Sequence, residues 1–209
     1  GNAAILLEDI GDLHESRKKA LYASIYDDAT WLNGLVENLL TITRTENGTV
    51  KLNLQSEMIS DAIEEALRHL DRNAARRKIV VALQDDLLMA EMDSALIVQV
   101  LINLINNAVK YTPENAGITI GAKPEGNMAV LWVEDEGQGI PEGDEDKVFE
   151  LFYTGIKRSP DSRRGIGLGL ALCRSIVQAH GGEIKVSNIQ PHGAKFLFTL
   201  PIAEVEEYE

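Results

Sequence analysis

The spacing of the apolar residues changes once along the chain, near residue 47, and this change limits what the chain can fold into. Before it the pattern is helical, with a short piece over Ala3–Asp12 and a long one over Ser16–Thr45. After the turn signal Asn47-Gly48, short apolar runs of strand length alternate with helical stretches. The sequence therefore predicts a helical segment over residues 1–46 and a mixed domain over residues 47–202.

The long helix carries an apolar stripe that repeats at three- and four-residue steps, close to a heptad seam, with Asp28 as a break. Such a stripe must be buried against other helices. It belongs either to a packing helix of the same domain or to half of a helical hairpin that pairs with a second chain, and its length favours the hairpin. The stripe consists of Leu21, Ile25, Leu32, Leu35, Leu39 and Ile42.

The mixed domain contains more strands than helices, and Gly126-Asn127 marks a hairpin between two of the strands. This order predicts a mixed sheet with helices on one face, a two-layer α/β sandwich of the α+β class, before an acidic, solvated tail over residues 203–209. The expected strands are Val50–Leu54, Ile79–Leu83, Ile118–Ala122, Ala129–Asp135, Ile184–Ser187 and Lys195–Leu200. The expected helices are residues 60–76 capped by Ser60, Ser94–Tyr111 capped by Asp93, and Leu168–His180 ended by Gly181-Gly182.

Composition excludes several classes of function. The net charge of −13 over 209 residues argues against nucleic acid or an anionic membrane surface as the main partner. A few local cations and a helix N-terminus can still hold a triphosphate on an acidic protein. The single cysteine, Cys173, excludes an internal disulfide and a cysteine metal cluster, and no apolar run approaches membrane-spanning length.

The helix over Ser94–Tyr111 places three polar side chains on one stripe. Asn103, Asn107 and Lys110 lie at i, i+4 and i+7, one above another. An asparagine oxygen is a suitable Mg²⁺ ligand, and the lysine can meet phosphate oxygens. The helix alone fits a metal and phosphate site and an ordinary polar surface equally well.

Two glycine-containing blocks follow. Asp135-Glu136-Gly137-Gln138-Gly139-Ile140 comes after an apolar strand, where a carboxylate can accept a hydrogen bond from a purine amino group. Taken alone, it more often is a turn capped by its aspartate. Gly165-Ile166-Gly167-Leu168-Gly169-Leu170 opens a helix whose N–H groups suit phosphates. A dinucleotide fingerprint would need a strand before it, whereas Tyr153–Arg164 is polar and basic and is expected to form a lid.

Phe149 and Phe152 precede this lid and are expected to hinge it to the core, unless both are simply core residues. Four blocks thus follow one another along the chain: Asn103–Tyr111, Asp135–Ile140, Phe149–Phe152 and Gly165–Leu170. In order and spacing they resemble the N, G1, F and G2 boxes of sensor histidine kinases, within the wider gyrase, heat-shock-chaperone, histidine-kinase and mismatch-repair ATPase superfamily. The resemblance covers residues 47–202 strongly, and residues 1–46 look like the dimerisation and phosphoacceptor hairpin. It implies a Bergerat-type ATP-binding fold that uses ATP and Mg²⁺.

By this resemblance Asn107 is the metal ligand, and Asn103 and Lys110 serve the catalytic γ-phosphate site. Tyr111 lies against the adenine and Asp135 reads its amino group. The other residues that the resemblance places at the nucleotide are Gly137, Gly139, Ile140, Phe152, Gly165, Gly167, Leu168 and Gly169. Hydrolases of the superfamily carry a glutamate one turn before the metal asparagine, where Asn103 stands here, and a neutral side chain favours phosphotransfer over hydrolysis.

Within the family, the stretches Val100–Pro113 and Ala171–Gly182 look most like the potassium-sensing, Kdp-type kinases. The family's acceptor motif is absent: His14 lacks the following proline and is expected to be a decoy, and His69, His180 and His192 are expected to be solvated or to cap turns. We therefore expect the acceptor histidine upstream of Gly1, and a fragment that binds Mg-ATP without phosphorylating itself.

The resemblance also implies partners: a response regulator receiver domain, a homodimer in the full-length protein, no nucleic acid, and a membrane only through upstream segments. It places the fragment in the cytoplasmic domain of a membrane-anchored bacterial sensor kinase. Two alternatives stay open, an ATPase or serine kinase of the same superfamily and a non-catalytic nucleotide-binding scaffold.

Overall fold

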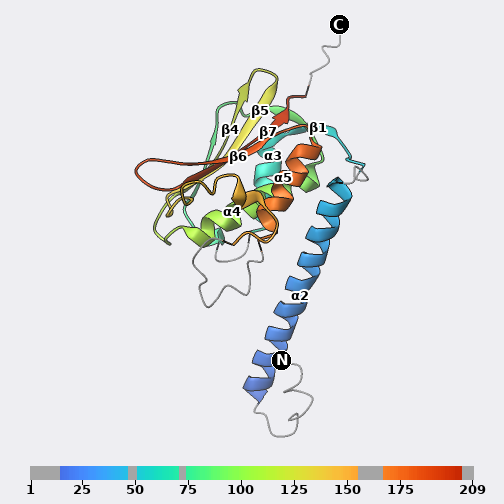
Figure 1. Cartoon of the computed structure of the whole chain (residues 1–209), viewed down its shortest axis with the longest axis vertical. Helices are drawn as coiled ribbons and strands as arrows, with labels where there is room; N and C mark the ends of the chain where they lie inside the picture. Colours follow the sequence, from blue (N-terminus) through green and yellow to red (C-terminus); the bar gives the residue numbers. More distant parts are fainter. Residues whose placement is uncertain (1–14, 47–50, 71–73, 155–166, 204–209) are drawn as a thin grey trace. The chain divides into compact units, whose positions relative to one another are not determined.

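The computed structural model describes residues 15–46, 51–70, 74–154 and 167–203 (Figure 1). The chain divides into two compact units, residues 1–40 and 41–209. The expected short helix over Ala3–Asp12, His14, most of the expected lid with Gly165, and nearly all of the acidic tail lie outside the described residues. None of the described helices is long and apolar enough to cross a membrane.

The first described element is the helix α2 (Glu15–Glu46), which confirms the long helix expected over Ser16–Thr45. Leu32 and Leu39 of the apolar stripe are exposed, as are the neighbouring Tyr26 and Val36. This helix therefore presents apolar side chains to its surroundings along much of its length.

Five strands form one mixed sheet, as expected. Its strand order is β2-β4-β5-β7-β6, in which only β2 and β4 run parallel. Along β7 every second side chain, Ala194, Phe196, Phe198 and Leu200, is buried, because successive residues of a strand face opposite sides of the sheet. The strands are β2 (Ile79–Leu83), β4 (Ile118–Glu125), β5 (Met128–Asp135), β6 (Ile184–Asn188) and β7 (Ala194–Pro201).

Three helices lie on one side of this sheet: α3 (Ile59–Arg68), α4 (Ser94–Tyr111) and α5 (Gly169–Ala179) (Figure 1). The expected cap of α4 is confirmed, because the Asp93 side chain accepts a hydrogen bond from the Leu96 N–H at 3.4 Å. The sheet and the helices enclose the core, which includes seven side chains of α4. These seven are Ile97, Val98, Val100, Leu101, Leu104, Ile105 and Ala108.

The strand expected over Val50–Leu54 is wrong. The strand is β1 (Gln55–Met58), and it pairs antiparallel with β3 (Met89–Met92), which the sequence analysis missed. Each of these two strands has only four residues, and residues 59–88 lie between them, so no local repeat identifies either.

The helix expected over residues 60–76 is shorter, and its expected cap at Ser60 is wrong. It begins at Ile59, whose N–H donates to the Leu88 carbonyl at 3.0 Å, and it ends at Arg68. Met58 occupies the N-cap position without a side-chain hydrogen bond. A carbonyl that is distant in sequence therefore takes the role expected of a local serine.

Candidate functional site

The polar stripe of α4 faces the start of α5. A Cβ built on Gly169, the first residue of α5, would lie 3.5 Å from Asn103 Oδ1. Asn103 Nδ2 is buried and has no hydrogen-bond partner among the described residues. Asn107 is half-buried on the same stripe, and Lys110 is exposed. Two carboxamides and one ammonium group thus run from the α5 N-terminus to the end of α4.

The C-terminal end of α4 supplies one wall of a pocket. Tyr111, its last residue, is 49% exposed, and Lys110 Nζ lies 4.9 Å from the centroid of the Tyr111 ring. Thr112 follows, and its buried hydroxyl lies close to the Asp135 carboxyl. This end of the helix therefore combines an aromatic face, a cation and a buried hydroxyl.

The opposite wall follows Asp135, the last residue of β5, which lies just behind it. Its side chain is buried, and Oδ1 accepts a hydrogen bond from the Gly137 N–H at 2.8 Å. Burial raises the pKa of the Asp135 carboxyl above its usual value, since low dielectric surroundings disfavour the charged form. Only glycine fits at position 137, because a Cβ there would lie 2.6 Å from Asp135 Oδ1 and 2.7 Å from the Tyr111 carbonyl oxygen.

Asn188 fixes the turn that follows Asp135, a role that the sequence analysis missed. Its Oδ1 accepts from the Ile140 N–H at 2.7 Å, and its Nδ2 donates to the Ile140 carbonyl at 2.8 Å. Gly139 has φ of +74°, and a Cβ on it would lie 2.6 Å from the same Asn188 Oδ1. A carboxamide from the end of β6 thus sets the path of the turn after β5.

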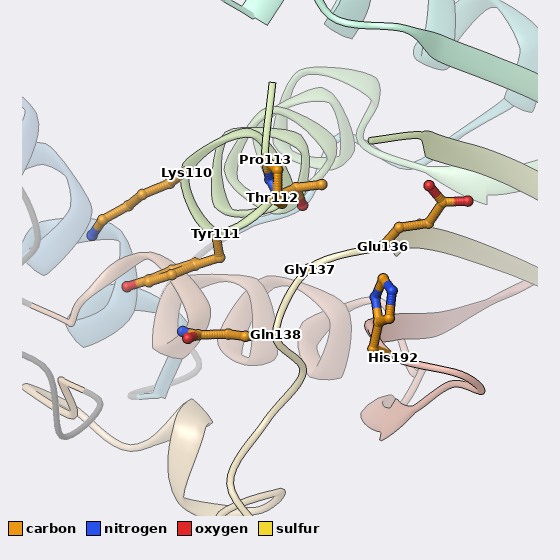
Figure 2. Close-up of a pocket in the computed structure, with 8 residues that line it drawn as sticks. All are labelled: Lys110, Tyr111, Thr112, Pro113, Glu136, Gly137, Gln138 and His192. Carbon is orange, nitrogen blue, oxygen red and sulfur yellow. The ribbon is translucent and has the colours of Figure 1, made fainter. Parts of the chain in front are cut away.

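The two walls enclose a pocket of about 520 Å³ (Figure 2). Figure 2 shows Lys110, Tyr111 and Gln138 toward one end of it, and Glu136 and His192 toward the other. The side chains come from the end of α4, the turn after β5 and the hairpin between β6 and β7. The lining residues are Lys110, Tyr111, Thr112, Pro113, Glu136, Gly137, Gln138 and His192.

Three of the expected nucleotide-contacting residues, Lys110, Tyr111 and Gly137, line this pocket. The other described ones do not line it: Asn103, Asn107, Asp135, Gly139, Ile140, Phe152, Gly167, Leu168 and Gly169 lie outside its lining. Thr112, Pro113, Glu136 and Gln138 were not expected in the site, although each adjoins an expected residue. His192 comes from a distant hairpin, and no sequence signal indicated it.

The expected phosphate-binding block meets the chain before the expected lid. The Phe152 N–H donates to the Gly167 carbonyl at 3.0 Å, and a Cβ on Gly167 would lie 2.2 Å from the Tyr153 carbonyl oxygen. Gly167 has φ of +76°, which suits glycine. The residues on either side of 155–166 are therefore in direct contact, and Leu168 behind them is buried at the start of α5.

The expectation that Phe149 and Phe152 both anchor the lid to the core is wrong for Phe152. Phe149 is buried and packs edge-on against Phe196, with ring centroids 6.3 Å apart. Phe152 is 62% exposed, at a backbone φ of +66° where the chain meets Gly167. The next residue, Tyr153, is held by its hydroxyl, which donates to Asp144 Oδ2 at 2.7 Å.

The expected solvated or capping roles are confirmed for the three described histidines, since His69 and His180 occupy the C-cap positions of α3 and α5 and His192 is exposed. His69 is an exposed residue at the end of α3, 2.7 Å from Glu65 Oε1. His180 is buried rather than solvated, and it holds two hydrogen bonds at the end of α5. His192 lines the pocket.

Residues 92–204 match the family described as histidine kinase-, DNA gyrase B-, and HSP90-like ATPase. Sensor protein KdpD of Clostridium acetobutylicum is 40% identical over 201 residues, which are 96% of this chain and 22% of that protein. The crystal structure of full-length ShkA in complex with AMPPNP is 26% identical, with a TM-score of 0.77, over 98% of this chain and 42% of that one. Histidine kinase ThkA in complex with response regulator protein TrrA is 25% identical, with a TM-score of 0.73, over 97% of this chain and 57% of that one.

Proposed function

Because this chain belongs to the histidine kinase-, DNA gyrase B-, and HSP90-like ATPase family, and its relatives are sensor histidine kinases, we propose that it binds ATP and donates the γ-phosphoryl group to a histidine. The observation that carries this proposal is the buried Asp135 carboxylate, held at the end of β5 beside a pocket with an aromatic wall. The chain spans 22% of the length of KdpD, so the proposal concerns the catalytic region of a longer protein.

The base is proposed to bind between Tyr111 and the turn that starts at Gly137. An ionised carboxylate accepts hydrogen bonds only, so Asp135 selects a donor such as the exocyclic amino group of adenine. Burial raises the pKa of Asp135 because the charged carboxylate is deprived of water. A hydrogen-bond donor on the ligand would replace part of that lost solvation. The Tyr111 ring and the glycine backbone supply flat surfaces on either side of a planar base.

The phosphates and Mg²⁺ are proposed to lie between α4 and the start of α5. The residues fit such a group: Asn103 Nδ2 is buried without a partner in the described chain, and Gly169 leaves space beside Asn103. Asn107 would hold the metal through its oxygen, since Mg²⁺ prefers oxygen ligands. Bound Mg²⁺ would neutralise charge on the phosphates, and the α5 N–H groups and Lys110 orient the phosphate oxygens.

Asn103 supports transfer over hydrolysis. An amide cannot take a proton from water, whereas a glutamate at the same position could. With no base at this position, the attacking group must be a nucleophile of its own, such as the imidazole of a histidine. We expect isolated protein to release little phosphate from ATP, and steady turnover in a phosphate-release assay would favour the ATPase alternative.

For the longer protein we propose the partners of its relatives. ThkA was crystallised with a response regulator, and a receiver domain of that class is the proposed acceptor downstream of the histidine. The exposed apolar side chains of α2, among them Tyr22, Tyr26 and Val36, support a homodimer through residues 1–46. The identity to KdpD supports a Kdp-type sensor, with this region on the cytoplasmic side.

A binding titration with a fluorescent ATP analogue, with and without Mg²⁺, tests the site. Asn107→Asp keeps an oxygen ligand but places a full negative charge beside the phosphates, which it repels, so we expect about a tenfold or greater loss of affinity for ATP with Mg²⁺. Asn106→Asp is the matched control, because it adds the same charge to the exposed neighbouring residue of α4. Equal affinities for wild type and Asn107→Asp would contradict the site.

A further inference from the structure

One arginine side chain holds the end of α4 from outside that helix. Arg77 Nη1 donates to the Val109 carbonyl at 3.1 Å, and Nη2 donates to the carbonyls of Thr112 at 3.1 Å and Pro113 at 2.6 Å. The last carbonyls of a helix lack partners within the helix and form the negative end of its dipole. The Arg77 guanidinium supplies both the donors and the positive charge that this end lacks.

The backbone on both sides of Arg77 is fixed by hydrogen bonds. Its own N–H donates to the Ala74 carbonyl at 3.0 Å, which closes the short 3₁₀ helix η1 (Ala74–Arg76). The next carbonyl, of Lys78, accepts from the Ile118 N–H at 3.1 Å, where β2 and β4 begin to pair. The guanidinium therefore projects from a part of the chain that is joined directly to the sheet.

The carbonyls that Arg77 binds continue into the opposite wall of the pocket. The Pro113 carbonyl also accepts from the Ala116 N–H at 3.0 Å. One residue further, the Gly117 N–H donates to Glu136 Oε2 at 2.9 Å, and the Glu136 N–H donates to the Gly117 carbonyl at 3.3 Å. Hydrogen bonds thus connect Arg77 to both walls, since Pro113 and Glu136 each line the pocket.

We infer that Arg77 is a positioning residue for the nucleotide base, although it does not line the pocket itself. This inference rests on the proposed function. Without the guanidinium, the carbonyls of Val109, Thr112 and Pro113 lose the Arg77 donors, although Pro113 keeps the Ala116 N–H, and the segment Tyr111–Pro113 is free to move away from Gly137. The base should then bind less tightly. Of the residues proposed for the phosphates and the metal, only Lys110 adjoins the released segment, while Asn103, Asn107 and the α5 N-terminus lie further away.

The experiment compares two ligands on the same variants. For Arg77→Ala we expect about a tenfold lower affinity for ATP with Mg²⁺. For Mg-tripolyphosphate, which has no base, we expect a smaller loss of about twofold, because only Lys110 of the phosphate residues adjoins the released segment. Arg77→Lys keeps the charge but presents a single ammonium group to three carbonyls, so its loss should be intermediate. Arg76→Ala is the control, because it removes the same charge from the exposed preceding residue and should change neither affinity.

Equal losses for ATP and tripolyphosphate would show a general structural role and overturn the inference, as would unchanged ATP affinity in Arg77→Ala. If that variant does not fold by circular dichroism, Arg77→Lys provides the same comparison. Hydrogen exchange at the Thr112 N–H, which donates to the Ala108 carbonyl at 3.0 Å, tests the contact without any ligand and should accelerate in Arg77→Ala. Wild-type protein that binds no ATP would refute the proposed function, whereas unaltered exchange would refute the role of Arg77.

Discussion

The Asp93 N–H donates to His180 Nε2 at 3.0 Å, so the residue that ends α5 is joined to the residue that caps α4. The other ring nitrogen, Nδ1, is 2.8 Å from the Ile176 carbonyl and must be the donor there. The imidazole is therefore neutral, with one nitrogen accepting and one donating. This single ring connects the two helices that carry the proposed metal and phosphate residues.

Protonation of His180 should destabilise the fold. Burial lowers the pKa of this imidazole below its ordinary value of 6.5, so the unfolded chain takes up the proton first as the pH falls. The stability that neutral His180 contributes is therefore complete above the pKa of this imidazole in the unfolded chain. It is lost as the pH falls from there through the lower pKa of the folded protein. Urea unfolding at about pH 7.5 and about pH 5.5 should show that the free energy of unfolding falls more for wild type than for His180→Gln. Equal losses in the two proteins would contradict this role.

Asp135→Asn should weaken nucleotide binding without weakening the fold. Removing a buried charge relieves the desolvation that raises the pKa of this carboxyl, so the unfolding temperature should stay the same or rise. A neutral acceptor binds an amino group less strongly than a carboxylate, and we expect about a tenfold loss of ATP affinity. Glu134→Gln removes the same charge from a carboxylate that pairs with Lys195 at 3.4 Å, and it should bind ATP normally. An equal loss of ATP affinity in Glu134→Gln would show that the net charge of the protein, and not the position of Asp135, causes the effect.

Gly167→Ala should damage the site more than an equivalent change elsewhere. The new Cβ would meet the Tyr153 carbonyl at 2.2 Å and push apart the two chain segments that meet there. Gly126→Ala is the control, because Gly126 has a similar positive φ of +63° but nothing within 4 Å of a Cβ. We expect the control to lose about 1–2 kcal/mol of stability with normal ATP affinity. Gly167→Ala should lose affinity as well, and calorimetric unfolding with a binding titration separates the two effects.

Asp144→Ala should change the titration of Tyr153. The hydrogen bond to Asp144 raises the pKa of the Tyr153 hydroxyl to about 12, from an ordinary value of 10.0. Without that acceptor, an additional tyrosinate should appear near the ordinary pKa in an ultraviolet absorbance titration. Asp146→Ala, an exposed carboxylate two residues away, should leave the titration unchanged. Identical curves for wild type and Asp144→Ala would show that the bond is absent in solution.

Local sequence patterns were sufficient for the central elements of the fold. The apolar spacing and the capping aspartate of Ser94–Tyr111 predicted α4, and Gly126-Asn127 predicted the β4–β5 hairpin. These signals lie within a few residues of the structure that they determine, because helix periodicity, caps and tight turns depend on neighbours in sequence. The two short strands β1 and β3 were not predicted, since each is recognisable only when it pairs with the other.

The sequence by itself therefore determined the class of fold, the order of the three helices and of the five strands of the main sheet, and the family to which the chain belongs. The tertiary structure alone decided which distant groups complete the site: Arg77 at the end of α4, Asn188 beneath the turn at Ile140, and His180 between the two helices. Each acts through hydrogen bonds to backbone groups dozens of residues away. Every residue has the same backbone groups, so no residue type at the receiving position marks such a contact, and only the folded chain shows which donor meets which acceptor.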